Sequence, residues 1–360
     1  MSVNRKIVWI GMIFLAIGIR IFSRFPEAVE KYYSNGLYPV TARIQRLLFG
    51  WVPFSVGDIF YGAAAIWLVY GLVSLVRKII KKQADRRYIF GLVRRTVFFL
   101  LSVYVIFNLF WGLNYDRKGI ADQLDLEVRS YSTGELADLV QVITERLNTL
   151  DSASLTRRGA LNSKHNLFSG AVASYGSLAV LDPRFAYPSP SVKPSVFSYL
   201  GNYLGFGGYY NPFSGEAQVN TTLPLFTQPF TACHEIGHQL GYAKENEANF
   251  AGYLSARASN DPAFRYSVYF DMYLYAAREL YIRDSNLLKP IKAQLKPAIR
   301  QDFRELQQFN RRYENPMEPV IQRLYGRYLR ANRQSHGIMT YNEVIAWLIA
   351  YSKKNGREAI

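Results

Sequence analysis

Three apolar runs stand out in the first third of the chain. They cover residues 7–22, 59–76 and 96–113, and the third carries no charged residue. Each is long enough, or nearly so, to cross the hydrocarbon core of a bilayer as a helix, which takes roughly 20 residues. The first run follows two basic residues, as in a signal peptide, but no small-x-small cleavage site comes after it. We therefore predict three transmembrane helices within a membrane region of residues 1–113.

The stretch between the second and third runs, residues 77–95, is strongly basic. It holds eight arginine and lysine residues against one acidic residue, Asp85. Such an excess is typical of the cytoplasmic loops of membrane proteins, so we expect this loop and the N-terminus on the cytoplasmic side of the cell (inner) membrane. Everything after Asn114 is then extracytoplasmic. Because the flanking spans account for the charge, we expect membrane lipids as partners and no nucleic acid.

From residue 114 to residue 360 the pattern becomes that of a soluble α+β domain, mostly helical with a small β-sheet. Ser132 to Glu135 form a capping box before an amphipathic run. Further helices are expected over residues 262–283, 297–331 and 341–351, the long one being broken or kinked at Pro316 and Pro319. Strands are expected over residues 171–180, 196–200 and 216–221.

Two shorter stretches leave alternatives open. Residues 38–49 form an amphipathic pattern, which suits a helix lying on the membrane surface or one packed against the soluble domain. Residues 216–220 are the candidate upper edge of a binding cleft, where a peptide can add as a further strand. Residues 205–210 are glycine-rich, and we expect a plain loop there rather than a flap.

The candidate chemistry is concentrated between Thr231 and Phe250. This stretch contains the motif His-Glu-x-x-His at His234, Glu235 and His238, which uses two of the four histidines in the chain. On a helix, the two histidines lie one turn apart on the same face and can bind one metal ion. Glu235 lies beside the first histidine, where its carboxylate can take a proton from a water at the metal.

A zinc ion in a hydrolytic site takes three protein ligands and keeps one open position, so a third ligand is needed. Gly241 suits a left-handed helix end that lets the chain reverse. A second helix is expected over residues 244–258, and it opens with two carboxylates. We choose Glu247 as the third ligand, with Glu245 as the alternative. Asn249 is expected to support a ligand through a hydrogen bond.

These motifs resemble those of known metallopeptidases. His-Glu-Ile-Gly-His followed by Asn-Glu-Ala-Asn-Phe-Ala is similar to the zincins of the gluzincin kind, in which a glutamate next to alanine on a second helix is the third ligand. The resemblance implies a zincin-like fold, Zn²⁺ as cofactor and a peptide or protein substrate. It matches His234, Glu235, His238 and Glu247. Only eight residues separate His238 from Glu247, fewer than in thermolysin-like enzymes.

The whole chain also resembles a bacterial membrane-protein family catalogued as domain of unknown function 3810. The resemblance rests on the hydrophobic start, on Trp-Gly-Leu-Asn-Tyr-Asp-Arg at residues 111–117 and on Asn-Pro-Phe-Ser-Gly-Glu-Ala at residues 211–217. It implies bacterial origin and a membrane anchor. It supplies no substrate and no oligomeric state.

We therefore expect a membrane-anchored zinc metallopeptidase. A non-catalytic zincin-like sensor or binding protein is the alternative, although such a protein needs no Glu235. The polar surroundings of the motif exclude an intramembrane protease. Cys233, the only cysteine, excludes an intramolecular disulfide and is expected to be a small buried residue behind the site. His165, His336 or a tyrosine could stabilise an oxyanion.

Overall fold

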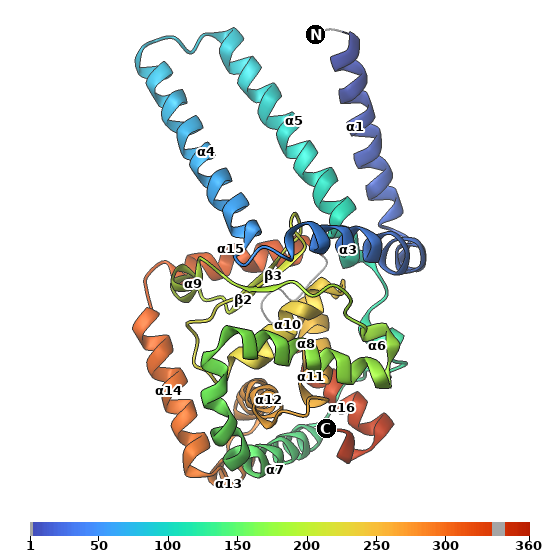
Figure 1. Ribbon diagram of the computed structural model, residues 1–360, viewed down its shortest axis with the longest axis vertical. Helices are drawn as coiled ribbons and strands as arrows, with labels where there is room; N and C mark the ends of the chain where they lie inside the picture. Colours follow the sequence, from blue (N-terminus) through green and yellow to red (C-terminus); the bar gives the residue numbers. More distant parts are fainter. Residues whose placement is uncertain (1–2, 333–342) are drawn as a thin grey trace.

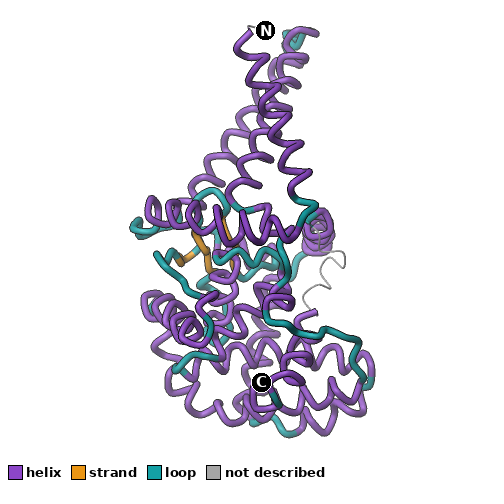
Figure 2. The backbone as a smooth tube through the Cα atoms, turned by 90° about the vertical axis from the view of Figure 1, so that its right-hand side faces the viewer, coloured by secondary structure: helices purple, strands orange, loops and turns teal. Residues whose placement is uncertain are grey.

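The computed structural model describes residues 3–332 and 343–360. Helices dominate this part of the chain. Three long helices project from one side of a mostly helical domain that holds one small sheet (Figure 1). A view turned by 90° shows the same division into a narrow stalk and a broad domain, with the strands just beneath the stalk (Figure 2).

The stalk is formed by α1 (Val3–Phe22), α4 (Val56–Ile80) and α5 (Arg86–Phe110). Among the described residues, α4 and α5 are each long and apolar enough to cross a membrane. α1 meets the same condition only together with the segment Pro26–Phe49, and that pair is bent by 103°. The helices indicate a membrane-associated protein with two supported spans, whereas α1 as a third span stays a prediction.

Both supported spans differ in length from their apolar runs. Asp85 caps α5 by accepting a hydrogen bond from the Tyr88 backbone N at 2.7 Å. Because α4 continues to Ile80 and α5 begins at Arg86, the basic stretch is mostly helical and only residues 81–85 connect the two helices. At its other end α5 stops at Phe110, before the predicted end of the run. The following 3₁₀ segment Gly112–Asp116 is largely buried in the domain. The apolar character after Phe110 therefore reflects burial in protein rather than in lipid.

The segment between α1 and α4 packs onto the domain. It contains α2 (Pro26–Ala28), the π-helical segment Val29–Leu37 and α3 (Tyr38–Phe49). α3 buries a face that includes Ala42 and Arg46, and it exposes the apolar side chains of Val40, Ile44, Leu47 and Leu48. Packing against the domain is thus confirmed for this helix. α3 lies between the spans and the domain, with this apolar face exposed (Figure 1).

The domain consists of eleven described α-helices and three strands. The helices are α6 (Ile120–Gln123), α7 (Thr133–Arg158), α8 (Lys164–Leu181), α9 (Ser198–Leu204), α10 (Gln228–Gln239), α11 (Glu245–Arg257), α12 (Pro262–Arg283), α13 (Ser285–Ala293), α14 (Pro297–Tyr313), α15 (Glu318–Ala331) and α16 (Glu343–Asn355). Short 3₁₀ segments cover Gly159–Asn162, Pro183–Phe185 and Arg357–Ala359. α10 and α11 lie in the middle of this set, packed on each other and on α8 and α12.

Several predictions made from local sequence features are confirmed. The capping box at Ser132 begins α7, α12 has the predicted bounds, and the long C-terminal piece breaks between α14 and α15. The strand predicted at residues 171–180 is wrong, because that stretch lies in α8. Ala171, Ser174, Tyr175 and Leu178 recur at helical spacing and are all buried. The strand predicted at residues 196–200 is also wrong, since most of it belongs to α9.

The sheet has the order β1-β3-β2, with β1 at Val192–Pro194, β2 at Gly208–Asn211 and β3 at Glu216–Val219. β1 pairs with β3 in parallel and β2 pairs with it antiparallel; Ala217 lies opposite both Val192 and Tyr210. The predicted strand at residues 216–221 is confirmed, but it is central, so the edge role expected for it is wrong. The edges are β1 and β2, and β2 lies in the stretch expected to be a loop.

A buried ion pair joins this sheet to a membrane span. Lys193 Nζ lies 2.5 Å from the carboxylate of Glu216, and both side chains are almost fully buried. The same carboxylate accepts hydrogen bonds from the backbone N of Val56 and of Gly57, at 3.3 and 2.6 Å. These donors belong to the first turn of α4, where a helix stabilises negative charge. The start of α4 is therefore fixed to the central strand.

Candidate metal centre

α10 brings the two histidines of the motif together. The helix starts at Gln228, and Pro229 fits its first turn, where a missing N–H costs nothing. The imidazole rings of His234 and His238 lie 4.7 Å apart between centroids and are nearly perpendicular. One ligand atom from each of His234, Glu235 and His238 can be chosen so that all lie within 4.8 Å of one another. The motif therefore forms a compact group able to hold a metal ion.

A turn and a second helix add a carboxylate to this group. Gly241 has φ +87°, the left-handed conformation predicted for the end of α10. Lys244 is extended, and α11 begins at Glu245. Glu245 Oε2 lies 3.3 Å from His234 Nε2 and 3.7 Å from His238 Nε2. Two imidazoles and one carboxylate thus face the same point.

Small residues allow the two helices to cross closely. A Cβ added at Gly252 would lie 3.0 Å from the backbone N of His234, and one at Gly237 would lie 3.2 Å from the carbonyl oxygen of Ala248. Side chains at these two positions would push α10 and α11 apart. The glycines therefore help to set the distance between Glu245 and the histidines.

Glu247 occupies a different place. Its Oε1 lies 3.2 Å from Lys244 Nζ, and the side chain is almost fully buried. That oxygen would lie 3.3 Å from a Cβ at Gly119, which precedes α6. Two positions along a helix turn a side chain by about 200°, so Glu245 and Glu247 point to opposite sides of α11. The preference for Glu247 as third ligand does not match this geometry, whereas the alternative, Glu245, does.

The orientation of His238 is fixed by the backbone. Its Nδ1 lies 2.8 Å from the carbonyl oxygen of Tyr242. A carbonyl can only accept, so Nδ1 must carry the hydrogen, and in the neutral ring Nε2 keeps its lone pair. This Nε2 is the atom that faces Glu245. The contact is the one commonly found behind a metal-binding histidine.

Burial and nearby charges shift the pKa values of these groups. Burial raises the pKa of Glu235 to about 7, against the lowering effect of His234 and His238. For His238, burial alone would lower the pKa, but the hydrogen bond and charge of Glu245 raise it to about 9. Burial likewise opposes ionisation of Glu245, and the two histidines nevertheless hold its pKa well below the usual range. These shifts favour a carboxylate at Glu245 paired with a protonated His238.

Glu235 is packed against the edge strand β2. A Cβ at Gly208 would lie 2.6 Å from Glu235 Oε1 and 2.7 Å from the carbonyl oxygen of Gln218. The other carboxylate oxygen, Oε2, is buried and has no hydrogen-bond partner among the described residues. Glu235 therefore has one oxygen packed against the strand and one without a protein partner.

With the site in view, the chain can be compared with known proteins. A family model described as "Protein of unknown function (DUF3810)" matches residues 33–349. The chain belongs to the DUF3810 family. Neither a curated protein nor a solved structure matches it. Membership of DUF3810 covers α4, α5 and the whole histidine site, and it assigns no activity.

Three aromatic residues of this DUF3810 chain hold the site from distant segments. Tyr325 of α15 donates a hydrogen bond to Glu245 Oε1 at 2.7 Å. Trp111, directly after α5, donates through Nε1 to the carbonyl oxygen of His238 at 3.1 Å. Tyr38 of α3 donates to the carbonyl oxygen of Gln239 at 2.8 Å. No motif marks their contacts in the sequence, because each depends on the tertiary arrangement.

The remaining predicted residues lie apart from the ligand group or behind it. Cys233 is fully buried, as expected, and burial raises its pKa to about 12. The hydrogen bond expected from Asn249 is not seen, since its buried Nδ2 has no partner among the described residues. His165 lies exposed in the first turn of α8. His336 lies outside the described residues.

Proposed function

We propose that this DUF3810 protein is a membrane-anchored, zinc-dependent metallopeptidase. The observation that carries the proposal is the convergence of His234, His238 and Glu245 on one point, with Glu235 beside them. Two imidazoles and one carboxylate form a ligand set used by hydrolytic zinc enzymes. Three protein ligands leave a fourth position for water and substrate.

The residues fit a zinc ion in two further respects. In the neutral ring of His238, the carbonyl of Tyr242 keeps the hydrogen on Nδ1, so the Nε2 lone pair on the side of Glu245 could bind a cation. Glu245 Oε2 lies near both Nε2 atoms, and a cation between them would bring all three donors into contact with one charge. We propose His234, His238 and Glu245 as the ligands; the place of Glu247 on the other side of α11, beside Lys244, argues against Glu247.

Glu235 is the proposed general base. When bound, zinc would polarise the scissile carbonyl and lower the pKa of the attacking water. Glu235 takes a proton from that water and passes it to the leaving amine. A base with a pKa near the working pH does both steps well, and burial raises the pKa of Glu235 to about 7. Among the described residues Glu235 Oε2 has no hydrogen-bond partner, so it is available for this transfer.

The position of the site supports a substrate held close to the membrane. Trp111 follows the last residue of α5 and bonds to the carbonyl of His238, so the end of a span touches the histidine helix. The basic residues around the α4–α5 connection lie at the opposite ends of these spans. By the positive-inside rule, we propose that the connection is cytoplasmic and the site extracytoplasmic.

A non-catalytic sensor or binding protein is the second candidate. Such a protein needs the three ligands, but it has no use for a base. Glu235 is nevertheless present, buried, and packed against Gly208 with an oxygen left without a partner. This environment supports catalysis over binding alone.

The test is hydrolysis of a broad peptide library by the purified full-length protein, followed by mass spectrometry. Glu235→Gln keeps the shape of the side chain and removes the base, so we expect it to retain zinc and lose turnover by about 10²- to 10⁴-fold. Glu305→Gln, the same change on the exposed surface of α14, is the matched control and should leave turnover unchanged. Equal turnover in the wild type and Glu235→Gln would reject the enzyme and leave the binding protein.

A further inference from the structure

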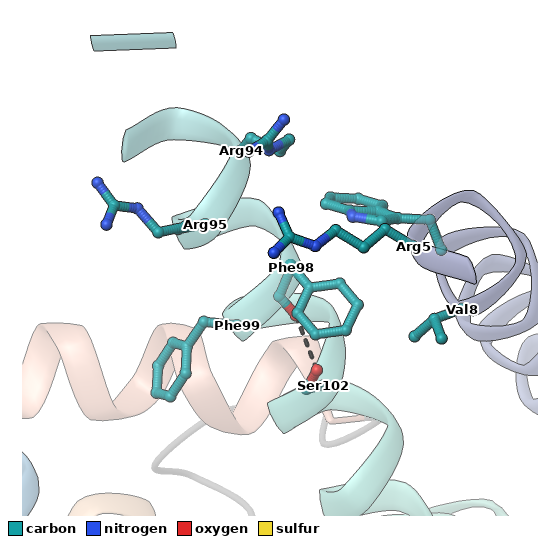
Figure 3. Close-up of a pocket in the computed structure, with 8 residues that line it drawn as sticks. Arg5, Val8, Arg94, Arg95, Phe98, Phe99 and Ser102 are labelled. Atoms are coloured by element: carbon teal, nitrogen blue, oxygen red, sulfur yellow. Dashed lines mark hydrogen bonds between the residues drawn. The ribbon is translucent and has the colours of Figure 1, made fainter. Parts of the chain in front are cut away.

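A cleft lies between α1 and α5, toward the ends of these helices that are far from the domain. Its volume is about 540 Å³, within the range of small-molecule sites. Arg5, Arg94 and Arg95 line it together with the aromatic side chains of Trp9, Phe98 and Phe99. Figure 3 shows Arg5, Arg94 and Phe98 on the side of α5 that faces α1, whereas Arg95 and Phe99 are turned to its other side.

The charge of the cleft is not neutralised by the residues that the structure describes. Among the described residues, no acidic side chain lines it and none forms an ion pair with Arg5, Arg94 or Arg95. The only hydrogen bond described for these guanidinium groups runs from Arg95 Nε to the carbonyl oxygen of Gly91, at 3.3 Å. Cations gathered beside apolar side chains repel one another and favour a bound anion.

The other part of the cleft is apolar. The rings of Trp9 and Phe98 lie 5.1 Å apart between centroids and join α1 to α5. Phe99 packs on the other side against Trp67 of α4, at 5.4 Å. A ligand that fills this space must therefore combine an anionic group with a hydrocarbon part.

The depth of the cleft in a membrane agrees with such a ligand. Arg94 and Arg95 lie eight and nine residues into α5, about 12 Å from the start of the helix. From this depth the guanidinium group of an arginine can reach the phosphates of the lipid headgroups, while its aliphatic stem stays in the apolar region. Arg86 and Arg87, in the first turn, lie farther out and do not line the cleft.

We propose that this cleft binds an anionic phospholipid. The guanidinium groups of Arg5 and Arg94 bind the phosphate, for which the planar arginine fork is suited, and Arg95 adds positive charge nearby. An acyl chain lies along the rings of Trp9 and Phe98. Inorganic phosphate alone fills only a small part of 540 Å³ and gains nothing from the aromatic wall. The proposal is independent of the zinc site, which lies at the other ends of the helices.

Native mass spectrometry of the full-length protein in detergent tests the proposal. Phosphatidylglycerol should bind, phosphatidylcholine should bind at least about tenfold more weakly, and the double variant Arg94→Gln, Arg95→Gln should lose about tenfold or more in phosphatidylglycerol affinity. Arg5→Gln should weaken binding in the same direction from the other helix. The matched control, Arg86→Gln with Arg87→Gln, removes the same charge from α5 outside the cleft and should change affinity by less than about threefold.

A second measurement locates the lipid. Phosphatidylglycerol with brominated acyl chains should quench tryptophan fluorescence, and Trp9→Phe should remove most of that quenching. Equal losses in the two double arginine variants would show general attraction to the charged helix ends and overturn the proposal. Equal binding of phosphatidylcholine, or displacement of the lipid by millimolar inorganic phosphate, would overturn it as well. Circular dichroism of each variant checks that a loss of lipid is not a loss of fold.

Discussion

At the scale of single residues, the two carboxylates at the start of α11 have opposite surroundings. Glu245 Oε2 faces His234 and His238, whereas Glu247 faces Lys244. We predict that Glu245→Ala lowers zinc affinity by about tenfold or more, a loss typical of disturbed metal sites. Glu247→Ala should keep the affinity within about threefold of the wild type. Competition with a chelating dye measures both, and the reverse order of the two variants would restore Glu247 as the ligand.

Gly208 gives a second prediction at this scale. A methyl group there would lie 2.6 Å from Glu235 Oε1, so Gly208→Ala must displace either the carboxylate or the strand. We expect peptide turnover to fall by about tenfold or more, part of the contribution of a general base, while zinc stays bound. Gly176→Ala is the control, because open space surrounds that position. Unchanged turnover in Gly208→Ala would mean that the contact with β2 does not position Glu235.

The histidine pair was predictable from sequence because its geometry is local. Residues 234 and 238 share a helix face wherever that helix lies. The proposed third ligand was not predictable in the same way. The choice between Glu245 and Glu247 depends on the residue at which α11 begins, and the extended conformation of Lys244 makes Glu245 the first helical residue. The contact from Tyr325 depends on how α15 packs, which no local pattern encodes.

At the scale of elements, the crossing of α10 and α11 determines whether the ligands meet. Gly252 faces the backbone N of His234 at a point where a Cβ would lie 3.0 Å away. Gly252→Val should force the helices apart, cost about 1–3 kcal/mol of stability and remove zinc. Thermal unfolding and metal analysis of the same sample measure both effects. A variant that keeps its zinc would show that the close crossing is not required.

Elements with caps or periodic faces were predictable, and short strands were not. α7 begins at its capping box, and α14 and α15 separate near Pro316. Residues 171–180 of α8 suggest a strand because their alanine, valine and leucine residues resemble those of a buried strand. Their buried positions nevertheless follow a helical period. β2 was not predicted, because its four residues follow a glycine-rich stretch and become a strand only by pairing with β3.

At the scale of the whole molecule, the proposed orientation in the membrane rests on the distribution of charge. The basic residues cluster at the far ends of α4 and α5, and the domain follows α5. We predict that a reporter fused after Arg87 behaves as cytoplasmic and that one fused at the C-terminus behaves as exported. A phosphatase and a fluorescent protein that mature on opposite sides of the membrane measure this. The opposite pattern would move the histidine site into the cytosol.

The metal content of the purified full-length protein decides whether this site holds zinc at all. We predict about one zinc per chain in the wild type, held by His234, His238 and Glu245. His234→Ala and His238→Ala should each reduce the zinc to background. His165→Ala, which removes an exposed histidine from α8, should leave it unchanged. Near-stoichiometric zinc in both His234→Ala and His238→Ala, or none in the wild type after zinc loading, would contradict the metal site.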